Sequence, residues 1–143
     1  MARKKIAIVF IAAIVLFLVI QIIPVGSGHS NPPVKAEPKW DSPKTRELVK
    51  RACFDCHSNE TVWPWYSYVA PVSWLVIQDA DEGRSVMNFS EWTPGMNEMK
   101  EDITREVKSG RMPPSQYTLL HPNAVLSAEE KSMFLDGIQK TMQ

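Results

Sequence analysis

The sequence predicts an all-α protein, with a bundle of about four helices that follows an apolar helix at the N-terminus. Three observations indicate this fold class. Apolar side chains recur at helical spacing in several segments, and capping residues stand where these segments begin and end. No segment shows the clear apolar–polar alternation of a half-buried strand. The chain has 143 residues, which allows one small domain after the apolar helix.

The N-terminal segment predicts a membrane anchor. Residues 1–5 carry a positive cluster, and residues 6–24 are apolar apart from Gln21. A helix over this run would be about 27 Å long, close to the hydrocarbon thickness of a bilayer. A cleaved signal peptide is the alternative, but the run is long for one and is not followed by a clear cleavage box. The basic end predicts a cytoplasmic N-terminus, so a single-pass helix would place the rest of the chain outside, in the periplasm or beyond.

Residues 25–40 predict a flexible linker, because they are rich in proline, glycine and serine. We expect His29, within this segment, to be solvated. The whole chain has 16 basic and 16 acidic residues, and 13 basic residues remain without the three of the N-terminal cluster. This balance argues against nucleic acid as a partner and leaves protein partners open.

Residues 41–143 predict the folded domain, and its first helix has a well-marked start. Ser42 is suited to the N-cap and Pro43 to the first turn. One stripe at helical spacing then faces the core; it consists of Leu48, Val49, Ala52, Cys53 and Cys56.

Three further helices are expected in the domain. The second spans about 71–86. The third begins at residue 97 or 98 and ends at Gly110, which suits a left-handed C-cap. The fourth begins at Ser127 with a capping box and continues to about residue 142.

One motif in the first domain helix carries a specific chemistry. Cys53–His57 has the form C-x-x-C-H, which is that of a covalent haem c attachment site. On a helix, Cys53 and Cys56 share a face and can both reach the vinyl groups of one porphyrin. His57 can then give the iron its proximal imidazole ligand. Such motifs receive haem outside the cytoplasm, which agrees with the predicted anchor.

Three other interpretations of these residues remain open. A thioredoxin-like redox pair would need a βαβ context, and the flanking segments predict helix and loop. A structural zinc site needs four ligands, and the chain offers Cys53, Cys56, His57 and a distant His121. The third is a plain disulfide or a chance match.

A six-coordinate haem needs a second axial ligand, and Met112 is the best candidate. It lies just beyond a predicted helix end and is followed by two prolines, which stiffen the loop that presents it. Methionine with histidine is a common axial pair in c-type cytochromes, and it gives a higher reduction potential than two imidazoles. His121, which precedes a proline, is the alternative ligand.

Three aromatic residues follow the motif closely. Trp63, Trp65 and Tyr66 are candidates for the walls of a haem pocket, with indole N–H and phenol O–H groups that could reach a propionate. Generic packing of a small core is an equally good explanation.

Together these motifs resemble the bacterial haem-binding domain family, a group of small, often membrane-anchored monohaem c-type cytochromes. The resemblance is carried by six stretches, namely Cys53–Thr61, Trp63–Ser67, Val72–Trp74, Asn88–Trp92, Gly110–Pro114 and Leu120–Pro122. It implies haem binding through Cys53, Cys56 and His57, and a cytochrome c-like helical fold around one covalent haem.

The function expected from these observations is that of a membrane-tethered carrier of single electrons on the extracytoplasmic side. Its partners would be the lipid bilayer, through the N-terminal helix, and redox proteins that the sequence does not identify. No catalytic residue is predicted, so a carrier is favoured over an enzyme. The alternative is a haem-based peroxidase or ligand sensor with a displaceable distal ligand, and a third option is an assembly subunit of a larger complex.

Overall fold

The computed structural model describes residues 2–143; Met1, which belongs to the predicted basic end 1–5, lies outside them. The structure is all-helical, and the described residues form no strand beyond a single bridge. The predicted all-α class is therefore confirmed. Its α-helices are α1 (Ala2–Ile20), α2 (Pro43–His57), α3 (Val72–Val86), α4 (Lys100–Ser109), α5 (Ser115–Leu120) and α6 (Ala128–Thr141). Three short 3₁₀ helices cover Trp65–Tyr68, Pro94–Met99 and Pro122–Ala124.

The helix ends follow the predicted caps closely. The Ser42 hydroxyl accepts from the Thr45 amide at 3.1 Å at the start of α2. Gly110 ends α4 in the left-handed region, with φ of 76°. Ser127 and Glu130 form the capping box of α6. One start differs, because residues 94–99 form a 3₁₀ helix and the regular helix α4 begins only at Lys100.

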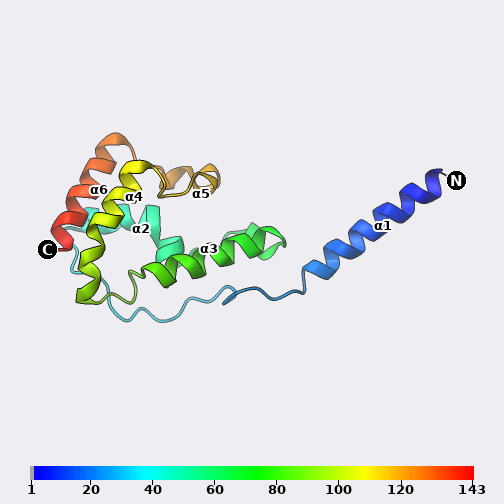
Figure 1. Cartoon of the computed structure of the whole chain (residues 1–143), viewed down its shortest axis with the longest axis horizontal. Coiled ribbons are helices and arrows are strands. Elements are labelled where there is room, and N and C mark those ends of the chain that lie inside the picture. The colour runs from blue at the N-terminus through cyan, green and yellow to red at the C-terminus, as the bar shows by residue number, and fades with distance from the viewer. Residues whose placement is uncertain (1) are drawn as a thin grey trace.

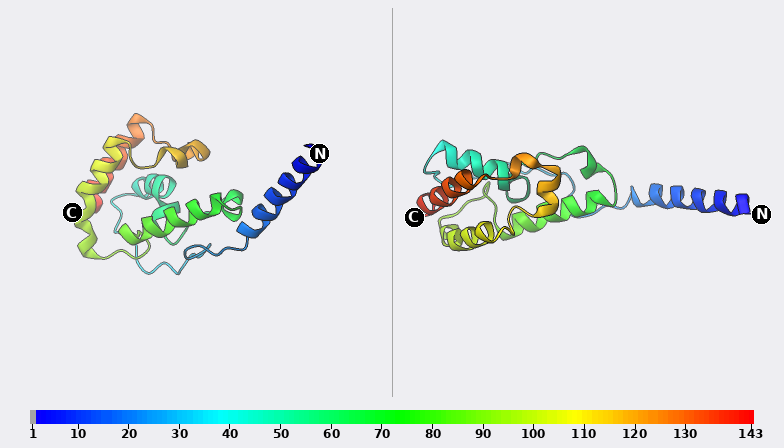
Figure 2. Two further views of the ribbon diagram at one scale, coloured as in Figure 1. Left: turned by 45° about the vertical axis from the view of Figure 1, so that its right-hand side comes forward. Right: turned by 90° about the horizontal axis from the view of Figure 1, so that it is seen from above.

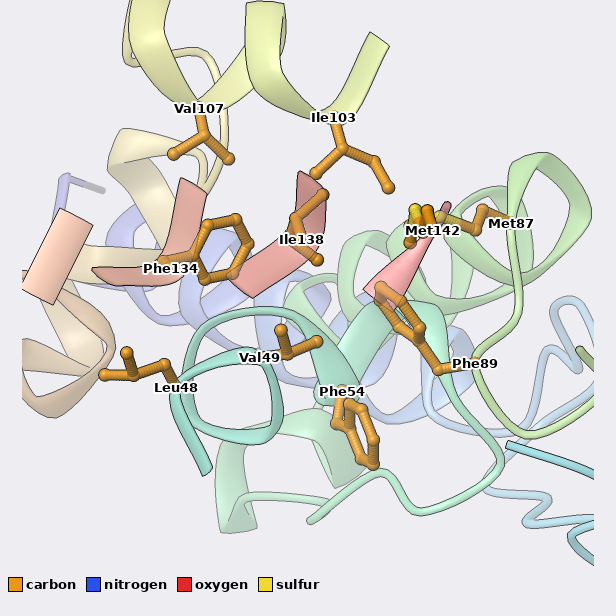
Figure 3. Close-up of a cluster of buried hydrophobic side chains, with 10 residues drawn as sticks. All are labelled: Leu48, Val49, Phe54, Met87, Phe89, Ile103, Val107, Phe134, Ile138 and Met142. Carbon is orange, nitrogen blue, oxygen red and sulfur yellow. The ribbon is translucent and has the colours of Figure 1, made fainter. Parts of the chain in front are cut away.

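The core lies where α2, α4 and α6 meet, as Figure 3 shows. Aromatic rings form one side of it, with Phe54 and Phe89 stacked at 5.7 Å between centroids. α2 also packs against α3, which runs beside it (Figure 1). The buried cluster consists of Leu48, Val49, Phe54, Met87, Phe89, Ile103, Val107, Phe134, Ile138 and Met142.

The structure does not support the predicted transmembrane helix. α1 begins with the basic cluster and ends at Ile20, so its uncharged part, Ile6–Ile20, is about 22 Å long and shorter than the ~30 Å hydrocarbon core. Within residues 2–143, no helix is long and apolar enough to cross a membrane. α1 projects from the other helices in every view (Figures 1 and 2).

Gln21 connects the end of α1 to the domain. Its side-chain Nε2 donates to the Ala70 carbonyl at 3.2 Å, and its side-chain Oε1 accepts from the backbone N–H of Ala70 at 2.9 Å. The single polar residue of the apolar run is therefore paired with backbone rather than with solvent.

Residues 25–40, expected to be a flexible linker, lie against the domain in defined contacts. The amides of Lys35 and Ala36 both donate to the Ser90 carbonyl, at 2.8 and 3.1 Å. Arg46 of α2 makes a bidentate pair with Glu37, at 2.7 and 2.6 Å. These bonds fix the second half of the segment beside α2 and the turn after α3.

His29 is half-buried, although its surroundings in the sequence predict a solvated side chain. Its ring stacks on Tyr68 at 3.9 Å between centroids. Its Nε2 lies 2.7 Å from the Ser67 carbonyl. The local composition does not predict this contact, because its partners lie about forty residues further along the chain.

Candidate functional site

A cavity of about 300 Å³ lies between α2, α3, α4 and the loop that precedes α5. Cys53, Cys56 and His57 line it from α2, and Met112 lines it from the loop. The structure thus brings the C-x-x-C-H motif and the predicted distal ligand to one place. Most of the remaining wall is apolar and includes Val86, Met87, Phe89, Met99, Ile103 and Val107.

His57 is held by backbone carbonyls at the end of α3. Its Nδ1 lies 2.9 Å from the Gly83 carbonyl and 3.2 Å from the Met87 carbonyl. Both oxygens are acceptors, so Nδ1 carries the proton and Nε2 keeps its lone pair. Burial lowers the pKa of His57 against the opposing effect of these two carbonyls, which favours the neutral ring. A neutral imidazole fixed through Nδ1–H is the usual state of a histidine that ligates iron through Nε2.

Gly83 allows α3 to approach α2 closely. A Cβ built at this position would overlap the Cys56 carbonyl. The residue was not among the predicted site residues. A glycine inside an otherwise regular helix is the signal that could have found it.

A buried polar network holds the chain at His57 and in the residues that follow it. The Phe89 amide donates to the His57 carbonyl at 2.8 Å. The Asn88 side chain donates to the Asn59 side chain at 2.8 Å. The backbone N–H of Asn59 donates to the Ser90 hydroxyl at 2.9 Å. The turn after α3 is therefore bonded directly to the C-terminal end of the motif.

The two cysteines are free and largely enclosed. Burial, more than any neighbouring charge, raises the pKa of both Cys53 and Cys56 to about 12. A redox-active pair of the thioredoxin type depends on a lowered thiol pKa, so this environment does not favour that interpretation.

His121 is engaged elsewhere, away from the cysteines. Its Nε2 lies 3.2 Å from the Tyr66 hydroxyl and its Nδ1 lies 3.0 Å from the Tyr117 carbonyl. Among residues 2–143, no group of three or more His, Cys, Asp or Glu side chains is arranged to hold a metal ion. The side chains that the zinc interpretation needs are therefore not brought together.

Met112 is held mainly through its backbone. Its amide and that of Arg111 both donate to the Glu106 carbonyl, at 3.2 and 3.1 Å, at the end of α4. Its side chain lines the cavity, and the residue as a whole is 38% exposed. Met112 therefore stands at the edge of the cavity.

The predicted pocket aromatics and the alternative distal ligand do not line the cavity. Trp65 is 78% exposed, and Trp63 packs edge-on against His29 at 4.8 Å. Tyr66 and His121 contact each other through the hydrogen bond described above. The chain after Pro64 forms a 3₁₀ helix beside residues 25–40, which takes these rings away from the cavity.

Tyr117 is the aromatic residue of α5 that lines the cavity. Its hydroxyl donates to the Asp55 carboxylate at 2.7 Å, within the motif itself. No sequence signal pointed to Tyr117, because α5 is too short to show periodicity.

A profile of the haem-binding domain family matches residues 15–140, a range that includes every residue of the cavity. The chain belongs to the haem-binding domain family. No curated protein and no solved structure matches it.

The cavity of this haem-binding domain fits the cofactor that the family is named for. It offers two thiols, an imidazole with a free Nε2 and a thioether, set in walls that are mostly apolar. Histidine imidazole and methionine thioether are common ligands of haem iron in proteins. Apolar walls around such a site limit the access of water.

Proposed function

We propose that the protein is a monohaem c-type cytochrome that carries single electrons outside the cytoplasm. The observation that carries the proposal is the convergence of Cys53, Cys56, His57 and Met112 on one apolar cavity. Cys53 and Cys56 would hold the haem through thioether bonds, with His57 and Met112 as its axial ligands. When bound, the haem supplies an iron that gains and loses one electron.

The residues of the chain then have distinct tasks around the iron. The carbonyls of Gly83 and Met87 hold the His57 ring through Nδ1, so that the lone pair of Nε2 is free to bind iron. The apolar walls limit water, and a methionine thioether raises the reduction potential relative to a second imidazole. These tasks are binding, orientation and tuning, as in a carrier, and they require no acid–base residue.

A second candidate function is favoured by the way in which Met112 is held. The hydrogen bonds of this loop are made by backbone amides to the Glu106 carbonyl, so the side chain can be displaced by a small ligand. Displacement would open one face of the iron, as a peroxidase or ligand sensor requires. The carrier is preferred because the cavity offers no distal histidine or arginine among its lining residues.

We further propose that α1 attaches the domain to a lipid surface. It projects from the domain (Figure 2), it has no buried residue, and most of its residues are apolar and exposed. Exposed apolar area of this kind favours association with a lipid bilayer, and the basic residues at the start of α1 add attraction to anionic lipids. The partners of the haem would then be redox proteins on the same side of the membrane.

The absorption spectrum of the ferric protein tests the carrier. We expect the far-red charge-transfer band of a methionine–iron bond, and we expect it to be lost in Met112→Ala and kept in His121→Ala. A high-spin spectrum in the wild-type protein, with immediate binding of cyanide or peroxide, would show the sensor or peroxidase instead.

A further inference from the structure

Apolar packing holds α5 only weakly. The helix has six residues and none is buried. Leu119 is 81% exposed and Leu120 is 58% exposed. Within the described chain, the close backbone contacts of α5 with other elements are confined to the 3₁₀ helix Pro122–Ala124. Because the protein buries little apolar area of α5, hydrogen bonds have a large share in fixing its position.

Two of these hydrogen bonds are made by side chains. The Tyr117 hydroxyl donates to Asp55 Oδ2 at 2.7 Å, and His121, just after α5, bonds to Tyr66. The other oxygen of Asp55 accepts from the Val62 amide at 3.0 Å. The carboxylate is thus fixed in the attachment motif, and a bond to a charged acceptor is stronger than one between neutral groups.

Tyr117 is also coupled to Met112 through a short piece of chain. Its amide donates to the Pro114 carbonyl at 3.1 Å, so α5 begins directly at the end of the Met112 loop. The other end of that loop is held at the Glu106 carbonyl. Both Met112 and Tyr117 line the cavity. The C-terminal end of the Met112 loop therefore moves with α5, and the interactions that fix α5 also fix this end of the loop.

We infer that Tyr117 is a positioning residue for the distal ligand: its hydrogen bond to Asp55 docks α5 on the attachment helix and thereby sets the place of Met112. This role of Tyr117 rests on the proposed function, in which Met112 is a ligand of the haem iron. Opening of this contact lets Met112 leave the iron, so the contact controls how readily an external ligand enters.

The test compares imidazole binding to the ferric holoprotein in wild type, Tyr117→Phe and Tyr68→Phe. Tyr117→Phe keeps the ring that stacks on His121 at 4.1 Å and removes only the hydroxyl. We expect imidazole to bind roughly tenfold more tightly, since the loss of one hydrogen bond raises the population with Met112 displaced. Tyr68→Phe is the matched control, because Tyr68 is exposed and stacks on His29 away from the cavity.

Amide hydrogen exchange gives a readout that does not depend on the axial ligand. Exchange in residues 115–121 should accelerate in Tyr117→Phe, while exchange in α2 and α6 stays as in wild type. The double variant Tyr117→Phe with Asp55→Asn should bind imidazole as Tyr117→Phe does, because without the Tyr117 hydroxyl the side chain at position 55 has no hydrogen bond to α5 that it could lose.

The outcomes separate this role from the proposed function. A wild-type protein with covalent haem but without the far-red band overturns both Met112 as ligand and the role of Tyr117. With the band present, an unchanged imidazole affinity or unchanged exchange in α5 overturns the role of Tyr117 alone. Tighter imidazole binding together with faster α5 exchange supports it.

Discussion

At the scale of single residues, Gly83 serves both the fold and the site. Its missing side chain allows α3 to lie against the Cys56 carbonyl. Its own carbonyl accepts from His57 Nδ1 and so orients the ring that we propose as the proximal ligand. Packing and ligand geometry therefore depend on the same backbone position.

Gly83→Ala should destabilise the protein by about 1–3 kcal/mol, because the new methyl group forces α2 and α3 apart. Urea unfolding of the holoprotein measures the change. Gly95→Ala is the control and should stay within about 0.5 kcal/mol of wild type, since a Cβ there meets no atom within 4 Å. Equal effects of the two substitutions would show that the close approach at Gly83 does not matter.

The grouping of the three C-x-x-C-H side chains could be predicted from the sequence because their relation is local. Cys53, Cys56 and His57 lie within one helical turn, so helix geometry alone brings them together. Trp63 and Trp65 were candidates for the pocket only through proximity in sequence. Trp63 packs on His29 instead, and Trp65 lies in the 3₁₀ helix that follows Pro64. Tyr117 enters the site through a hydrogen bond to a residue far away in sequence, and no local pattern encodes that contact.

At the scale of elements, capping residues were the most informative signals. Ser42, Gly110 and Ser127 each mark a helix end in the structure, because capping satisfies backbone groups next to the residue itself. The segment 25–40 was harder to predict. Its composition indicates flexibility, but Glu37 is fixed by Arg46, which lies in α2.

The Glu37–Arg46 pair should make stability depend on pH. The hydrogen bond from Arg46, against the effect of burial, lowers the pKa of Glu37 below 4.5. The ionised carboxylate therefore stabilises the folded state above about pH 4.5, and this contribution is lost as the pH falls through the folded-state pKa. Unfolding by urea between about pH 3 and pH 6 measures it.

Glu37→Gln should be less stable than wild type by about 1 kcal/mol at neutral pH, and this difference should shrink as the solution is acidified. The exposed Glu98 provides the control through Glu98→Gln. A difference between wild type and Glu37→Gln that stays constant down to about pH 3 would contradict the role of the ion pair.

At the scale of the whole molecule, the structure has two parts of different character. A haem-binding domain contains the core and the cavity, and α1 projects from it (Figure 1). The apolar side chains of α1 are exposed. The apolar run was evident in the sequence. The length of the helix was not evident in the sequence, because α1 ends at Ile20 while the apolar residues continue to Ile23.

Removal of α1 should abolish attachment to lipid and leave the haem site intact. The purified holoprotein would be cleaved at a protease site introduced at residues 22–24, and both forms would be floated with vesicles of anionic lipid. We expect binding at least about tenfold weaker without α1, because its apolar area is lost. The two forms should have the same absorption spectrum. Equal flotation would contradict a role of α1 in lipid binding.

The central claim is that Cys53 and Cys56 hold one haem covalently, and the mass of the denatured protein tests it most directly. The protein would be made in cells that attach haem c, unfolded, digested and measured by mass spectrometry. The peptide that contains both cysteines should carry the mass of one haem, and the variant Cys53→Ala/Cys56→Ala should carry none. Free cysteines in that peptide, open to alkylation and without added mass, would contradict the account.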